Sequence, residues 1–202
     1  GVTHVIRGED HIPNTARQIL IASALSFPSP IYAHLPLVLE ESRTKLSKRK
    51  GALPVTAYRD MGYLPEAMLN FMAFTGWNPG GEREIYTLKE LVDIFEIEKV
   101  HKGGAVLNKE KLAWMNKEHM RKQTEKEQLD AVVVYMKEYK EDLLKRLLPT
   151  IIDRISAYGE LASIEGSEFR FFITPPDISL EKIIWKDDTV SHAKIHLEKI
   201  AF

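Results

Sequence analysis

The sequence contains no cysteine, and this absence removes several kinds of chemistry at once. Without thiols the chain can form neither disulfides nor thiolate zinc sites, so no structural zinc is expected. No run of eighteen apolar residues occurs, so we expect no membrane span. No basic signal-peptide start is visible either, and together with the missing thiols this predicts a cytoplasmic protein. Glycine-rich phosphate loops of the P-loop or dinucleotide type are also missing.

Charge of either sign is nearly balanced, with a formal net charge of -1, yet positive charge is concentrated in one octamer. Five of the eight residues from Arg43 to Lys50 are Lys or Arg, and none is acidic. The octamer follows the apolar run 35–39 and precedes Gly51, which predicts a mobile loop after a buried strand. Two lysines three apart, with a serine between them, can hold a phosphate chain from several sides. A solvated basic loop explains the same composition.

A second basic cluster lies between Lys99 and Lys122, where seven Lys or Arg residues accompany only two acids. Contacts to a nucleic-acid backbone need lysines without base-specific geometry, so this cluster is a candidate surface for such contacts. A solvated helix face explains it equally well. Two histidines four apart, His192 and His196, have no acidic partner at a fixed spacing, so no metal site is predicted.

Residue patterns predict an α/β start followed by helices. We expect a strand at 4–7, then a well-buried helix at 15–25 with Asn14 as its N-cap. A second strand is expected at 31–39, interrupted by Pro36 because proline cannot donate to a sheet ladder.

Helix signals dominate from Pro54 onward. Pro65 predicts the first turn of a helix at 65–76, and Asn108 predicts the cap of another. Capping boxes of the Thr-x-x-Glu form begin at Thr87 and Thr124. Further helices are expected at residues 143–148, 150–158, 180–185 and 190–202.

Three blocks at the start of the chain carry a resemblance to a known family. They are His4-Val5-Ile6-Arg7-Gly8-Glu9-Asp10-His11, Leu35-Pro36-Leu37-Val38 and Lys45-Leu46-Ser47-Lys48-Arg49. With the later blocks at 71–77, 83–88 and 111–116, they resemble bacterial-type class I glutamyl-tRNA synthetases, strongly over residues 1 to about 120. The resemblance implies a mostly α chain. Residues 1–52 would be the tail end of a Rossmann-type α/β catalytic domain, 53–120 a helical stem-contact region, and 121–202 the start of a helical anticodon-binding domain.

The resemblance also implies an activity. The parent enzyme would be a glutamate–tRNA ligase (EC 6.1.1.17), which activates L-glutamate with ATP and Mg²⁺ to glutamyl-adenylate and transfers it to tRNA(Glu). A monomer is implied. The lysines Lys102, Lys109, Lys111 and Lys117 would then be contacts to tRNA.

In that family the pentapeptide is the KMSKS loop, which stabilises the pyrophosphate leaving group. Matching positions imply Lys48 as the main phosphate ligand, Lys45 as a second cation and Ser47 as a hydrogen-bond donor, all three catalytic. Mobile cations that approach the developing charge would lower the barrier. This chain has Leu46 in place of the motif's Met and Arg49 in place of its final Ser. Arg49 also falls at the nucleotide, as do Asp10 and the backbone of Leu37 and Val38.

Arg7 is the residue that the resemblance places against the side-chain carboxylate of glutamate, with His11 nearby. A planar guanidinium suits a carboxylate and rejects the neutral amide of glutamine. The alternative from the residues alone is an ion pair between Arg7 and Glu9 or Asp10.

Several readings stay open. The family's His-x-Gly-His element does not occur, and both ends resemble cut ends, so we expect a fragment that cannot form the adenylate alone. Robust tRNA-dependent ATP–pyrophosphate exchange by the chain would contradict this. A glutaminyl-tRNA synthetase would continue into a β-barrel instead of helices. A paralogue that glutamylates queuosine in tRNA would end soon after the pentapeptide. A non-catalytic tRNA-binding module is the alternative of a different class.

Overall fold

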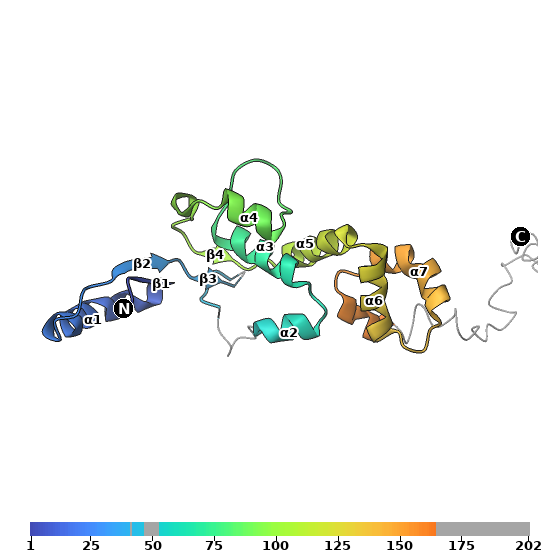
Figure 1. The fold of residues 1–202 in the computed structure, drawn as a ribbon, viewed down its shortest axis with the longest axis horizontal. Coiled ribbons are helices and arrows are strands. Elements are labelled where there is room, and N and C mark those ends of the chain that lie inside the picture. The colour runs from blue at the N-terminus through green and yellow to red at the C-terminus, as the bar shows by residue number, and fades with distance from the viewer. Residues whose placement is uncertain (41, 47–52, 165–202) are drawn as a thin grey trace, which may run out of the picture. The chain divides into compact units, whose positions relative to one another are not determined.

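The computed structural model describes residues 1–40, 42–46 and 53–164 (Figure 1). Residues Gly1–Ala162 make one compact unit, and the elements below belong to it except for the end of the last helix. Ser47, Lys48 and Arg49 of the pentapeptide lie outside the described residues. So do the predicted helices at 180–185 and 190–202, with His192 and His196. Within the described part, no helix has the length and apolar character needed to cross a membrane.

The chain opens with a β-α-β arrangement. Strand β1 (His4–Gly8) is followed by the short 3-10 helix η1 (Glu9–His11), helix α1 (Ile12–Ala24) and strand β2 (Ile31–Leu35). The two strands pair in parallel, which confirms the predicted first strand and sets Arg7 opposite His34. Because the strands are parallel, their carboxyl ends meet at one edge, where η1 leaves β1.

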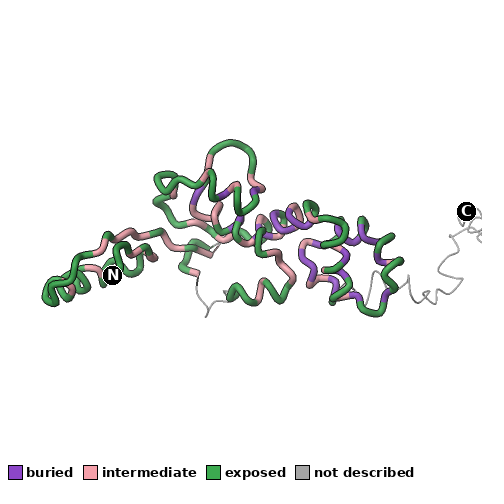
Figure 2. The backbone as a smooth tube through the Cα atoms, in the orientation of Figure 1, coloured by how far each residue is buried: buried purple, intermediate pink, exposed green. Residues whose placement is uncertain are grey.

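Two predictions for α1 are wrong. Its N-cap is His11, not Asn14, because η1 already turns the chain and the helix starts at Ile12 with Pro13 in the first turn. No residue of α1 is buried, and Leu20 remains 70% exposed (Figure 2). An apolar composition on all sides of a helix implies burial only if other elements cover it, and the described residues leave most of α1 uncovered.

Pro36 separates two strands, as predicted. Strand β3 (Val38–Leu39) pairs in parallel with β4 (Ala105–Val106), a strand that the sequence did not indicate. The approach is close at Gly104, where a Cβ atom would lie 3.1 Å from the carbonyl oxygen of Leu37. A side chain at this position would therefore push β3 and the segment before β4 apart.

The middle of the chain is helical. It contains α2 (Val55–Asp60), α3 (Pro65–Gly76), α4 (Leu88–Ile94), the 3-10 helix η3 (Ile97–Lys99) and α5 (Lys109–Lys122). Helix α3 has the predicted bounds, the capping box at Thr87 is present, and the Asn108 side chain accepts from Lys111 N at 2.8 Å. Two clusters of buried side chains hold these helices: Phe71, Leu112 and Met115 form one, and Trp77, Tyr86 and Leu91 the other.

The last described elements are α6 (Glu125–Tyr135), α7 (Glu141–Arg154), the 3-10 helix η4 (Tyr158–Glu160) and α8 (Leu161–Ile164). The capping box at Thr124 is confirmed. The two helices predicted at 143–148 and 150–158 are one helix, α7, with Pro149 inside it. Pro149 is exposed, while Leu148 and Ile151 beside it are buried. Their burial offsets the lost backbone hydrogen bond.

Candidate functional site

Lys45 is fixed by a short hairpin at the base of the predicted loop. It forms an antiparallel bridge with Leu39, and the flanking bonds run from Leu46 N to the Val38 carbonyl (3.1 Å) and from Glu40 N to the Thr44 carbonyl (2.8 Å). The first lysine of the pentapeptide is therefore held next to β3 by backbone hydrogen bonds.

An ion pair joins Lys45 to the end of β1. Its Nζ lies 2.7 Å from Oδ2 of Asp10 in η1. The hydrogen bond from Lys45 holds the pKa of Asp10 below its ordinary value, against a smaller opposing effect of desolvation. Two residues assigned to the nucleotide from the sequence, 35 positions apart, thus contact each other as a charged pair.

Arg7 lies on β1 without an ion-pair partner among the described residues. Its Nη2 donates to Thr15 Oγ1 at 2.8 Å and its Nε donates to His34 Nε2 at 3.4 Å. The two acids that could have neutralised it are engaged elsewhere: Asp10 with Lys45, and Glu9 Oε1 with the backbone N–H of Leu37 at 3.3 Å. Within the part of the chain described, the simple alternative of a local ion pair therefore does not account for Arg7.

The backbone at Leu37 and Val38 is largely occupied by internal bonds. The Leu37 N–H donates to Glu9, the Leu37 carbonyl accepts from Ala105 N at 3.3 Å, and the Val38 carbonyl accepts from Leu46 N. Both residues also border an apolar cavity of about 920 Å³ that extends to Leu46 and α3. A contact from this backbone to a nucleotide stays a prediction.

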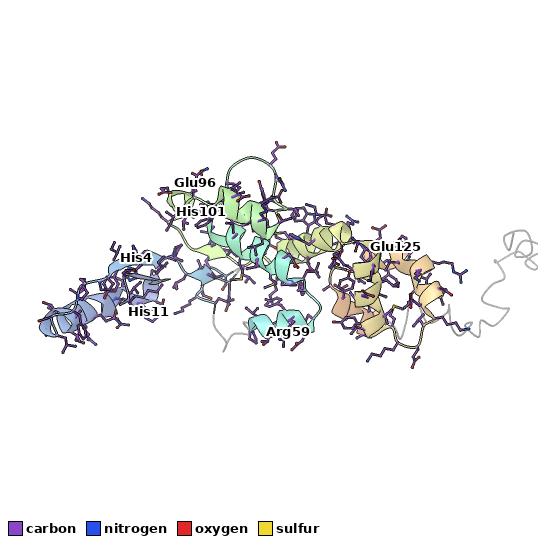
Figure 3. All side chains as sticks on the ribbon, viewed as in Figure 1. His4, His11, Arg59, Glu96, His101 and Glu125 are labelled. Atoms are coloured by element: carbon purple, nitrogen blue, oxygen red, sulfur yellow. The ribbon has the colours of Figure 1, made fainter. Side chains whose placement is uncertain are left out.

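His11 lies near Arg7 in sequence but forms no contact with it that the structure shows. It is exposed at the end of η1, and its Nδ1 lies 3.5 Å from Nδ2 of Asn14 (Figure 3). Its predicted role at the glutamate remains a prediction.

The four lysines predicted to contact tRNA fall into two pairs. Lys111 Nζ lies 2.5 Å from Glu84 Oε1, and Lys117 Nζ donates to the carbonyl of Asp153 at 2.6 Å. Lys102 and Lys109 are exposed, and neither forms an ion pair with another described residue. Lys111 is thus paired with an acid, whereas Lys117 bonds a neutral carbonyl, and Lys102 and Lys109 have no charged partner among the described residues.

Three residues around Arg7 were missed from the sequence: Thr15, Tyr32 and His34. The Tyr32 ring centroid lies 5.3 Å from the Arg7 guanidinium carbon. The signal that could have found His34 is the parallel register, which sets it opposite Arg7 once the β-α-β arrangement is assumed. Thr15 lies one helical turn beyond His11, so it faces the same edge.

Comparison with known proteins identifies the class. Residues 1–114 match the family model described as tRNA synthetases class I (E and Q), catalytic domain. The chain belongs to this family, and the predicted resemblance to class I synthetases is confirmed.

The named relatives are more particular. Over 122 residues, which is 60% of this chain and 26% of the relative, the chain is 57% identical to a glutamate–tRNA ligase of Aquifex aeolicus. A glutamate–tRNA ligase of Nitrosomonas europaea is 36% identical over 95% of this chain and 46% of its own length. The solved glutamate tRNA ligase of Elizabethkingia meningosepticum, a complex with its amino acid, matches 98% of this chain and 48% of its own at 26% identity and a TM-score of 0.70. The chain spans about a quarter of the first of these relatives.

Proposed function

We propose that this chain takes part in the ligation of glutamate to tRNA(Glu), through ATP-dependent formation of glutamyl-adenylate. The supporting observation is the geometry at the carboxyl end of β1. There an arginine without an acidic partner among the described residues lies three positions before an aspartate that is paired with Lys45. Ligands of open parallel sheets bind outside the carboxyl ends of the strands, where these groups lie.

The chemistry of the proposal follows from charge. Attack of the glutamate α-carboxylate on the α-phosphate of ATP expels pyrophosphate, and negative charge builds up on the leaving phosphates. Lys45, with Lys48 and Arg49 further along the pentapeptide, would stabilise that charge, and Ser47 would donate a hydrogen bond. Asp10 orients Lys45, since it holds the ammonium group at 2.7 Å.

Mg²⁺ would arrive with ATP, held by phosphate oxygens and water. The described residues contain no group of three His, Asp or Glu side chains placed to hold a metal ion. We also propose that the protein is cytoplasmic and monomeric.

Titration of the chain with MgATP tests the nucleotide part of the proposal. Replacing Lys45 by Ala removes one cation from the phosphates. We therefore expect a dissociation constant for MgATP that is about tenfold higher, measured by calorimetry. Lys145→Ala is the matched control, because Lys145 also forms an exposed ion pair, with Glu141 at 2.8 Å. Equal affinities for the Lys45 and Lys145 variants would contradict the assignment of Lys45.

A non-catalytic role in binding tRNA is a second candidate function. It is favoured by Lys102 and Lys109, whose exposed side chains form no ion pair with the other described residues. Binding of tRNA without MgATP affinity would support this function over ligation.

A further inference from the structure

The Arg7 guanidinium is held on three sides by neighbours from β2 and α1. Thr15 Oγ1 accepts from Nη2, His34 Nε2 accepts from Nε, and the Tyr32 ring lies under the guanidinium carbon at 5.3 Å. Tyr32 and His34 are themselves nearly parallel, with an interplanar angle of 5° and ring centroids 6.5 Å apart. The Arg7 guanidinium, which we propose binds the carboxylate of glutamate, is therefore held by residues that bring no negative charge.

These contacts occupy one edge of the Arg7 guanidinium, and they leave another edge available to bind a carboxylate. An arginine offers two edges to a carboxylate, one formed by Nε and Nη2 and the other by Nη1 and Nη2. Here Nε donates to His34 and Nη2 donates to Thr15, and the two acceptor atoms lie only 3.2 Å apart, so both lie at the Nε–Nη2 edge. The Nη1 hydrogens and the second Nη2 hydrogen have no partner among the described residues. Only the end-on edge can receive a second acceptor pair.

Hydrogen-bond counting also fixes the state of His34. Its Nε2 lies 3.4 Å from Arg7 Nε and 3.2 Å from Thr15 Oγ1. Because Arg7 can only donate, Nε2 must be an acceptor, and the proton of neutral His34 belongs on Nδ1. Thr15 accepts from Arg7 and gives its own proton to the His11 carbonyl at 3.3 Å, because the one lone pair of His34 Nε2 already accepts from Arg7.

We propose that Thr15 and His34 are positioning residues that commit Arg7 to end-on recognition of the substrate's side-chain carboxylate. This inference rests on the proposed function for its ligand, and it adds the mode of recognition. A carboxylate accepts both end-on hydrogens. A carboxamide would turn its own NH₂ toward one of them, so a rigid end-on edge favours glutamate over glutamine. An unheld arginine would retain its charge but could rotate to other edges.

The first experiment tests, without any ligand, whether His34 accepts a hydrogen bond from Arg7. Long-range ¹H–¹⁵N NMR spectra of the 202-residue chain distinguish the two neutral tautomers of His34. The expected result is a bare Nε2 and a proton on Nδ1, with the Nε2 resonance shifting in Arg7→Lys. Protonated Nε2 with a bare Nδ1 would overturn the positioning even if L-glutamate binds.

The second experiment measures L-glutamate and L-glutamine binding by NMR titration. Thr15→Val removes the acceptor at nearly constant shape, and we expect about tenfold weaker L-glutamate binding because a charge-assisted hydrogen bond is lost. Thr15→Ser should restore the affinity, and Thr56→Val on α2 is the matched exposed control. For His34, Gln supplies an acceptor near the Nε2 position and should bind L-glutamate more tightly than Leu does.

The outcomes separate the two proposals. If Arg7→Ala loses L-glutamate binding but Thr15→Val and His34→Leu do not, the positioning proposal is overturned and the assignment of Arg7 stands. If the unaltered chain shows the expected tautomer yet no shift with L-glutamate, the assignment of Arg7 to glutamate fails, and the recognition mode proposed here fails with it.

Discussion

Asn116 is a fully buried polar side chain that connects three segments distant in sequence. From α5 it accepts from the backbone N–H of Leu64, ahead of α3, at 2.8 Å and donates to the carbonyl of Ser156, beyond α7, at 2.6 Å. Its exposed fraction is 0%. A buried amide with both ends satisfied specifies the arrangement of its neighbours, because each broken bond would leave a polar group without water.

Asn116→Ala is therefore expected to destabilise the fold. The substitution leaves a partly buried N–H and a partly buried carbonyl without this partner, so we expect a loss of about 2 kcal/mol in the free energy of unfolding. Urea unfolding followed by circular dichroism measures it. Asn14→Ala on exposed α1 is the control and should change the free energy by less than about 0.5 kcal/mol. Equal effects of both substitutions would show that the buried amide is not a structural link.

A second buried asparagine, Asn70, links α3 to other elements through its side-chain oxygen, whereas its Nδ2 has no hydrogen-bond partner among the described residues. Its Oδ1 accepts from the backbone N–H of Tyr86 at 2.8 Å and lies 3.0 Å from Nε2 of His119. Burial is the main cause that lowers the pKa of His119, which favours the neutral ring. Both asparagines connect α5, which begins at Lys109, with α3 or the residue before it.

At the scale of elements, the capping box of α4 makes the stability of this helix depend on pH. The Glu90 carboxylate accepts from Thr87 N at 2.8 Å and also pairs with Arg83. The backbone hydrogen bond from Thr87, followed by the Arg83 contact, lowers the pKa of Glu90 from 4.5 to about 2. A lowered pKa in the folded state stabilises the fold above the unfolded value and ceases to do so as pH falls.

We therefore predict that Glu90→Gln removes part of the acid sensitivity of the fold. The melting temperature of the unaltered chain should fall more steeply than that of the variant between pH 4.5 and about 2. At pH 7 the variant should melt lower, because it has lost the charged cap. Glu98→Gln, at an exposed position in η3, serves as the control. Parallel curves for Glu90→Gln and the unaltered chain would exclude a role for this carboxylate.

Two glycines join α2 to the segment after α7 by direct backbone contact. The Gly159 N–H donates to the Met61 carbonyl at 3.0 Å, and the Tyr158 N–H donates to the Gly62 carbonyl at 3.3 Å. A Cβ atom on Gly159 would lie 2.4 Å from the Met61 carbonyl oxygen. Gly62 also has a φ of +79°, which side chains rarely tolerate. Only glycine at both positions allows this approach.

Gly159→Ala should consequently open the junction. We expect a loss of about 1–3 kcal/mol in unfolding free energy, typical of overpacking against atoms that cannot rotate away. Hydrogen exchange should also accelerate in α2, which lies between the pentapeptide and this contact. Gly103→Ala is the matched control, since a Cβ there meets nothing within 4 Å. If α2 exchanged at the same rate in both variants, the junction would not hold α2 in place.

At the scale of the whole molecule, local signals in the sequence predicted where helices start, but they did not predict contacts between distant segments. Pro65 fixed the start of α3, and the two capping boxes fixed α4 and α6, because proline and cap residues act within one turn. The pairing of β3 with β4 spans 67 positions, from Val38 to Ala105, and only the folded chain brings them together.

The candidate site shows the same division. The resemblance pointed to Arg7, Asp10 and Lys45, and the structure joins Asp10 to Lys45 and leaves Arg7 without an acidic partner among the described residues. Thr15 and His34 carried no signal of their own, because each becomes relevant only through the parallel register of β1 and β2. The exposure of α1 was missed for the same reason, since composition indicates a need for burial but not which element supplies it.

The salt dependence of tRNA binding distinguishes a four-lysine surface from a two-lysine one. Each phosphate contact releases counterions, so removing Lys102 and Lys109 together should reduce the slope of log K against log salt by about two. Lys111 and Lys117 already bond to Glu84 and to the Asp153 carbonyl. Their removal should lower the urea midpoint and leave the slope nearly unchanged. Filter binding between 50 mM and 200 mM salt, a range wide enough for the slope, measures it. Equal slope changes for both pairs would instead support contacts from all four lysines.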